Sequence, residues 1–137
     1  MKKVILASHG KLSEGMYDSV RMIIGNVEDL TYFGLKEGQD NNEIADLVQK
    51  YMDENGKESQ YIIVCDLLGG SVSNAVSRFS IQDNVYVING MNMGLVISLL
   101  LEPGDLDPGR ISELIEESKT GISLVSLNSS TDEDDII

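Results

Sequence analysis

The 137-residue sequence has no tryptophan, one cysteine, two prolines and one histidine. A single cysteine excludes a disulfide within the chain, and Cys65 ends the apolar run YIIVC, so we expect a buried thiol in a reducing compartment. The sequence has no Pro/Ser/Gly-rich linker, which indicates one domain of sufficient length for a real core. No obvious cluster of metal ligands is present, and we expect no metal and no other cofactor.

Long apolar runs and basic residues are also scarce. No run is long enough to span a bilayer, and residues 4–7 are too few for the core of a signal peptide. Ten Lys+Arg stand against 23 Asp+Glu, a formal net charge of -13. Such a field repels nucleic acid and anionic membranes. We therefore expect a cytoplasmic protein that binds no nucleic acid and whose partners present basic or apolar surface.

Short apolar runs alternate with helical patterns along the chain. Residues 4–7, 31–35, 61–66, 84–88 and 122–127 have the β-branched and apolar composition of strands. Strands that alternate with helices and are nearly all apolar predict an α/β fold, with a mainly parallel sheet of four strands and helices on both faces. The last run follows the final helix and would be a further strand.

The helical segments carry apolar residues at a spacing of three and four, which places them on one face. Gly25 and Gly56 end the first two helices, Asp40 or Asn41 begins the second, and Asp107 followed by Pro108 begins the last. The residues expected to face inward are Leu12, Met16, Val20, Ile23 and Ile24 in the first helix, Ile44, Leu47, Val48, Tyr51 and Met52 in the second, Val72, Ala75, Val76 and Phe79 in the third, and Ile111, Leu114 and Ile115 in the last.

The single histidine, His9, comes just after the first strand. In parallel α/β sheets, ligands bind beyond the carboxyl ends of the strands, where the strand order reverses. Asp66 ends the third strand, so the two side chains would meet if these strands are neighbours. A carboxylate that accepts from one imidazole N–H fixes the tautomer and leaves the other nitrogen as the nucleophile. This pairing suits a histidine that becomes phosphorylated.

Gly69, Gly70 and Ser71 follow Asp66 and lead into a helix. Paired glycines can point backbone N–H groups at an anion, and the hydroxyl of Ser71 adds a donor, so the three residues form a candidate phosphate-binding loop. The other interpretation is a tight turn with Ser71 capping the helix. Asn89 and Asn92 either line the same crevice or cap a turn and a helix.

Three segments, SHGKLSEGMYDSV, DLLGGSVSNAVSR and INGMNMGLV, together resemble the enzyme IIA component of the mannose family of the bacterial phosphoenolpyruvate:sugar phosphotransferase system (PTS). The resemblance covers residues 1 to about 127. It implies that Nε2 of His9 accepts a phosphoryl group from phosphorylated HPr and that a IIB component receives it for sugar uptake through IIC and IID. This chain would meet the membrane only indirectly. Asp66 would orient the ring, and Ser71 would bond to the phosphoryl group.

The resemblance further implies a homodimer in which residues 122–127 form a strand exchanged between subunits. It places one IIA domain at residues 1–127. The acids at 132–135 separately predict an acidic flexible tail at 128–137. Two positions depart from the family pattern, because Val72 and Gly94 stand where many members have proline. Neither departure removes a group that takes part in the chemistry.

Three alternatives stay open. A histidine-type phosphatase usually places an arginine beside its histidine, where this chain has Ser8, and Arg21, Arg78 and Arg110 all fall on predicted helices. A regulatory or binding module of the same fold would keep all three motifs. The related component that serves dihydroxyacetone kinase has a different second motif after the aspartate.

Overall fold

The structure is a computed structural model that describes residues 1–127. Its elements in chain order are β1 (Lys2–His9), α1 (Leu12–Ile24), β2 (Leu30–Leu35), α2 (Asn41–Asn55), β3 (Gln60–Cys65), α3 (Ser71–Val76), the 3₁₀ helix η1 (Ser77–Ile81), β4 (Val85–Asn89), α4 (Met93–Leu101) and α5 (Pro108–Lys119). Strands and helices alternate up to α4, and α5 follows after a short connection.

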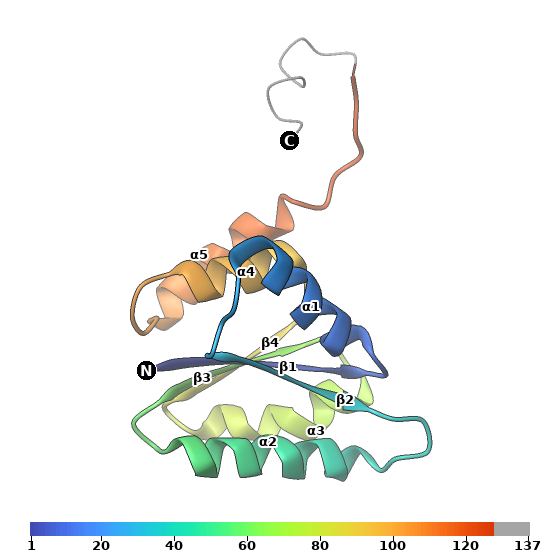
Figure 1. The fold of residues 1–137 in the computed structure, drawn as a ribbon, viewed down its shortest axis with the longest axis vertical. Coiled ribbons are helices and arrows are strands. Elements are labelled where there is room, and N and C mark those ends of the chain that lie inside the picture. The colour runs from blue at the N-terminus through green and yellow to red at the C-terminus, as the bar shows by residue number, and fades with distance from the viewer. Residues whose placement is uncertain (128–137) are drawn as a thin grey trace.

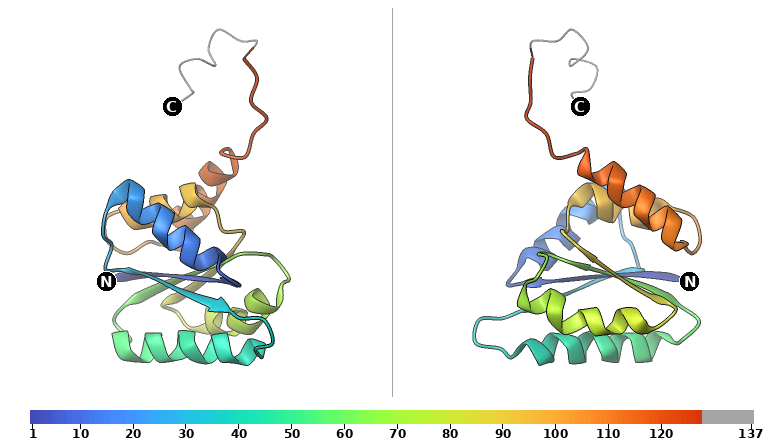
Figure 2. Two further views of the ribbon diagram at one scale, coloured as in Figure 1. Left: turned by 45° about the vertical axis from the view of Figure 1, so that its right-hand side comes forward. Right: turned by 180° about the vertical axis from the view of Figure 1, so that it is seen from behind.

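The four strands are all parallel and lie in the order β2-β1-β3-β4. Helices α1, α4 and α5 cover one face of the sheet, and α2 and α3 cover the other (Figure 1). The two views of Figure 2 show the same three layers. The predicted α/β class, with a parallel four-stranded sheet between helices, is therefore confirmed.

The core follows from the alternation of side chains along each strand. Val4 and Leu6 of β1 pack into the cluster beneath α1 and α4, whereas Ile5 and Ala7 pack into the cluster against α2 and α3. All four side chains are fully buried. A strand with an apolar layer on both faces needs apolar residues at every position, which explains the continuous run in the sequence.

The helix ends agree closely with the capping signals. The Asp40 side chain accepts a hydrogen bond from the Asn42 N–H at 2.9 Å, so the aspartate is the cap of α2. Asp107 does the same for the Arg110 N–H at 2.8 Å, and Pro108 is the first residue of α5. Gly25 and Gly56 follow the last residues of α1 and α2.

Three helical residues that were predicted to face inward are exposed instead. Leu12, Ile23 and Leu47 are 53%, 61% and 44% exposed. In α1 the only buried residues are Ser13 and Val20, and in α2 they are Ile44, Ala45, Val48 and Met52, so the buried face of each helix is narrower than its apolar stripe. The central positions Val20, Ile44 and Val48 are almost completely buried, as predicted.

Residues 122–127 form no strand in the single chain, which differs from the further strand that the sequence predicts. The exchange of this strand between subunits stays a prediction. The segment leaves the end of α5 and extends away from the sheet (Figure 1). Leu124 is 96% exposed and Ile122 is 79% exposed, so nothing within residues 1–127 covers this apolar stretch. The predicted tail at 128–137 lies outside the described residues, and the domain boundary at 127 stays a prediction. None of the helices within 1–127 could cross a bilayer.

Candidate functional site

His9 is the last residue of β1, and its side chain contacts the loop that follows β3. Nδ1 of the ring lies 2.8 Å from Oδ2 of Asp66, and Nε2 lies 2.9 Å from Oγ of Ser71. The backbone N–H of His9 donates to the same Oδ2 at 2.8 Å. Both ring nitrogens and the main chain of His9 are therefore fixed from one neighbouring loop. The side chain remains 45% exposed, so a partner can still reach the ring.

Asp66 is mostly buried, with 9% of its side chain exposed. Its Oδ2 accepts two hydrogen bonds from His9, whereas its buried Oδ1 has no hydrogen-bond partner among the described residues. A buried carboxylate with few donors is poorly stabilised by its surroundings. Both hydrogen bonds that this carboxylate accepts from the described residues therefore come from His9.

The double glycine lets the loop pass directly against the ring. Gly69 has a φ of +76°, which side-chain-bearing residues rarely adopt. A Cβ at Gly70 would lie 3.2 Å from Cε1 of His9, so a larger residue there would press on the imidazole. Ser71 begins α3, but its hydroxyl makes no capping bond and instead meets His9. The interpretation of Ser71 as a helix cap is therefore wrong.

The strand order explains why these residues meet. The chain leaves β1 towards β2 on one side of the sheet and later places β3 on the other side of β1. This reversal lies between β1 and β3, and ligands of open α/β sheets bind at such a point, beyond the carboxyl ends of the strands. The condition set in the sequence analysis, that the first and third strands are neighbours, is confirmed by their pairing.

The two asparagines lie close to the site but have structural partners. Oδ1 of Asn92 accepts from the Leu95 N–H at 2.7 Å, so this residue caps α4. Oδ1 of Asn89 accepts from the Ser73 hydroxyl at 2.6 Å, which ties the end of β4 to α3. The capping interpretation is therefore confirmed for Asn92, and Asn89 supports the helix that carries Ser71.

The surface around His9 carries apolar and charged groups that the sequence reasoning missed. Leu67 and Leu68, in the loop after Asp66, are 57% and 78% exposed. Beside His9, a groove of about 380 Å³ is lined by Gly10, Lys11, Ser13, Glu14, Tyr32, Gly34, Lys36 and Glu37. Gly34 could have been recognised from sequence, because a glycine inside a strand often marks a close approach of two backbones.

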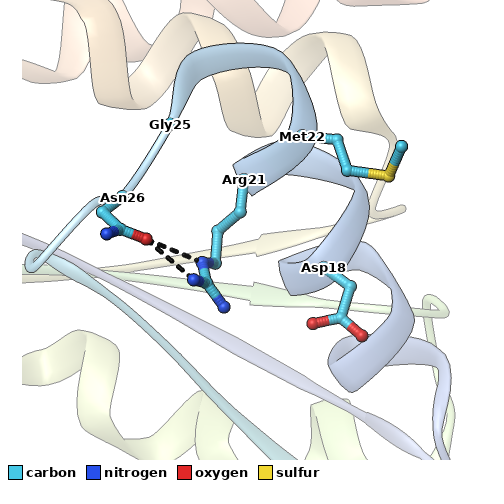
Figure 3. A pocket seen from close by; sticks show the side chains of 5 residues that line it. All are labelled: Asp18, Arg21, Met22, Gly25 and Asn26. Carbon is cyan, nitrogen blue, oxygen red and sulfur yellow. Dashed lines mark hydrogen bonds between the residues drawn. The ribbon is translucent and has the colours of Figure 1, made fainter.

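A larger hollow, of about 610 Å³, lies at the other end of α1 (Figure 3). Arg21 points across it, and its Nε and guanidinium nitrogen donate to Oδ1 of Asn26 at 3.2 and 2.7 Å (Figure 3). Because the residues that follow α1 lead into the start of β2, this hollow lies at the opposite edge of the sheet from His9. Its lining contains no histidine, so it has no counterpart of the hydrogen-bonded pair His9 and Asp66.

The single cysteine is not available for chemistry. Cys65 is buried, and burial raises the pKa of its thiol to about 12, so it stays protonated at neutral pH. Within residues 1–127, no group of three or more histidine, cysteine, aspartate or glutamate side chains is arranged to hold a metal ion.

The fold and the site together define a class of protein: a doubly wound parallel α/β domain with a single histidine where the strand order reverses, between β1 and β3. The chain belongs to the EIIA-man family of PTS components, because the family model described as "PTS system fructose IIA component" matches residues 3–117. The sorbose-specific EIIA component of Klebsiella pneumoniae is 29% identical over 101 residues, which is 73% of each chain. The membership confirms the resemblance seen in the sequence and implies a phosphotransferase role.

Solved structures share the fold. The mannose/sorbose-specific IIA subunit from Enterococcus faecalis has a TM-score of 0.83, covers 94% of this chain and 98% of its own, and is 21% identical. A sigma-54 interaction domain protein from the same organism has a TM-score of 0.62 at 13% identity, over 87% of this chain and 90% of its own. The fold therefore also occurs in a protein that is named as a sigma-54 interaction domain protein and not as a PTS component.

Proposed function

We propose that this protein is a phosphocarrier that accepts a phosphoryl group from phosphorylated HPr on Nε2 of His9 and passes it to a IIB component. The observation that carries the proposal is the placement of one imidazole between Asp66 Oδ2 at Nδ1 and Ser71 Oγ at Nε2. Asp66 is the orienting group, and Gly69, Gly70 and Ser71 bind the phosphoryl oxygens. No metal or other cofactor takes part.

The proton positions follow from the donors available. A carboxylate oxygen only accepts, so the neutral imidazole carries its proton on Nδ1, and Nε2 has a free electron pair that accepts from the Ser71 hydroxyl. This pair attacks the phosphorus of the donor's phosphohistidine. The new Nε2–P bond forms as the donor's N–P bond breaks, and the donor nitrogen keeps the bonding electrons. No proton has to leave Nε2 first.

Charge moves onto the imidazole as the phosphoryl group arrives. Nε2 gives up its electron pair, so positive charge develops on a ring that still bears the Nδ1 proton. The Asp66 carboxylate, whose Oδ1 has no partner among the described residues, stabilises that charge. The Ser71 hydroxyl rotates from Nε2 to a phosphoryl oxygen, and the flexible glycines let nearby N–H groups follow. Transfer to IIB is the reverse reaction with a different acceptor.

Arginine placement argues against a phosphatase. Phosphatases that use a histidine usually bind phosphate with a neighbouring arginine. In the described chain, Arg21 bonds to Asn26, Arg78 lies over the ring of Phe79, and Arg110 pairs with Glu102 and Glu113. None of these contacts is with His9. A carrier, which must hold its phosphohistidine without hydrolysing it, fits this arrangement better.

A regulatory domain is the second candidate, because the fold is shared with the sigma-54 interaction domain protein. Such a domain would take the phosphoryl group on His9 but would not pass it on. We favour the carrier because the matched family is one of PTS components. We also place the protein in the cytoplasm as a homodimer, in contact with the IIC and IID membrane components only through IIB.

The test is phosphorylation in a reconstituted mixture of enzyme I, HPr and labelled phosphoenolpyruvate. The wild-type protein should gain an acid-labile, base-stable label that maps to the peptide containing His9. His9→Ala should gain none while its circular dichroism spectrum is unchanged. Label that persists on His9→Ala, or no label on the wild type while HPr is fully phosphorylated, would contradict the proposal.

A further inference from the structure

Two serines beside the site have completely buried side chains, Ser8 and Ser13. A buried hydroxyl is costly unless it is hydrogen-bonded, so each must have a defined partner. Oγ of Ser8 accepts from the backbone N–H of Ser13 at 2.8 Å, and Oγ of Ser13 donates to the carbonyl oxygen of Phe33 at 2.9 Å. These two bonds join the end of β1, the first turn of α1 and β2.

The first of these bonds takes the place of an ordinary helix cap. The residue before α1 is Lys11, whose side chain makes no capping bond, so the free N–H groups of the first turn need other acceptors. Ser8 supplies one from within the strand. Its hydroxyl thereby sets how far α1 starts from the end of β1, and hence the path of the two residues between them.

The same turn is also held from β2. The N–H of Gly10 donates to the carbonyl oxygen of Leu35 at 2.8 Å. A Cβ on Gly34 would lie 2.2 Å from the carbonyl oxygen of Gly10, so the backbones are already in contact. The turn therefore cannot move towards β2, and the serine bonds stop it from moving along β1.

Neighbouring residues of a strand point to opposite faces. Ser8 lies on the face covered by α1, and His9 points to the face that carries Ser71 and α3. We propose that Ser8 and Ser13 are positioning residues, which hold the end of β1 so that the His9 ring fits between Asp66 and Ser71. The inference rests on the proposed function, because positioning matters only if this ring reacts. Loss of the serine bonds would let β1 shift and would lengthen both contacts of the ring.

The experiment compares Ser8→Ala and Ser13→Ala with Ser59→Ala. Ser59 is a matched control because it is 6% exposed and its hydroxyl donates to the Asn55 carbonyl oxygen at 3.1 Å, at the opposite edge of the sheet. Two properties are measured: the nitrogen-15 shifts of the His9 ring across pH in the unphosphorylated protein, and the rate of phosphorylation at saturating phospho-HPr.

We expect Ser8→Ala and Ser13→Ala to move the ring shifts towards a mixture of tautomers and to lower the saturated rate about tenfold. Ser59→Ala should lower the melting temperature but keep the wild-type ring shifts and rate. Wild-type shifts and rate in the two site variants would overturn the proposal. If Ser8→Ala does not fold, Ser13→Ala decides, since it keeps the Ser13 N–H bond to Ser8 and removes only the link to β2. If wild-type protein takes no phosphate, the proposed function fails, whereas the ring shifts still test the positioning.

Discussion

One carboxylate oxygen, Oδ2 of Asp66, accepts hydrogen bonds from both the backbone N–H and the ring Nδ1 of His9. The two bonds fix the orientation of the ring relative to the backbone and keep the ring proton on Nδ1. Asp66 thus has two separable effects, one on geometry and one on charge. A substitution that keeps an oxygen in place but removes the charge separates them.

Asp66→Asn is that substitution. Its amide oxygen can occupy the place of Oδ2, so the fold should persist, but the neutral amide stabilises less positive charge on the ring. We expect phosphorylation by phospho-HPr to slow by about 10- to 100-fold, the range found when a carboxylate that orients a metal-binding histidine is lost. The rate is measured by rapid quench, with circular dichroism as the check on folding. Unchanged kinetics would mean that Asp66 acts only in the fold.

Gly34→Ala tests the contact between β2 and the turn after His9. The new Cβ would lie 2.2 Å from a backbone oxygen of Gly10, so one of the backbones must move. We expect a loss of about 1–3 kcal/mol in the free energy of unfolding, measured in urea, together with slower phosphorylation.

Gly15→Ala is the matched control for that variant. Gly15 lies within α1, and a Cβ there would meet nothing within 4 Å. Replacing a glycine inside a helix with alanine should raise stability by about 0.5–1 kcal/mol. If both alanine variants had the same stability, the close approach at Gly34 would have no energetic effect.

Some secondary-structure elements could be predicted from their own sequences, and others could not. The central strands β1 and β3 were predictable because buried parallel strands are apolar, and the partly exposed edge strands β2 and β4 still have short β-branched or aromatic runs. Helix α2 was predictable because its cap, its stripe and its closing glycine agree. Helix α4 was not delimited in advance, since its sequence MGLVISLLL is apolar on every side and has no stripe. Residues 122–127 have the composition of a strand but pair with no other strand among the described residues.

The exchanged strand is the prediction that belongs to this segment. Strand β4 is at the edge of the sheet, and a groove of about 470 Å³ lies between it and α5. If residues 122–127 of a second subunit pair there, a chain cut after Gly121 should lose its partner. Analytical ultracentrifugation should give a dimer for the full chain and monomers or aggregates for the truncated one. A well-folded dimer of the truncated chain would refute the exchange.

The site required information from across the chain. His9, Asp66 and the loop of Gly69, Gly70 and Ser71 could each be chosen from sequence, because they follow strands that end at one edge. Whether they meet depends on the pairing of β1 with β3, and the order of strands in a sheet cannot be read from the residue pattern of any one segment. The serine bonds under α1 were not foreseen, because Ser8 and Ser13 look like ordinary turn residues until their burial is known.

The overall charge of -13 leads to a prediction about partners. An acidic protein attracts a partner whose docking face carries basic groups, and dissolved salt screens that attraction. We therefore expect the second-order rate of phosphorylation by phospho-HPr to fall as ionic strength rises, while the rate at saturating donor stays the same. A second-order rate that does not depend on salt would show that apolar contacts, such as those offered by Leu67 and Leu68, dominate docking.

Passage of the phosphoryl group onwards is what distinguishes a carrier from a phosphatase or a regulatory domain. The most direct measurement is therefore a chase. The protein is phosphorylated with labelled phosphate, separated from HPr, and mixed with a mannose-family IIB component. The account predicts that the label leaves His9 and appears on IIB. Label that stays on His9 in the presence of IIB, or that is released as inorganic phosphate, would contradict it.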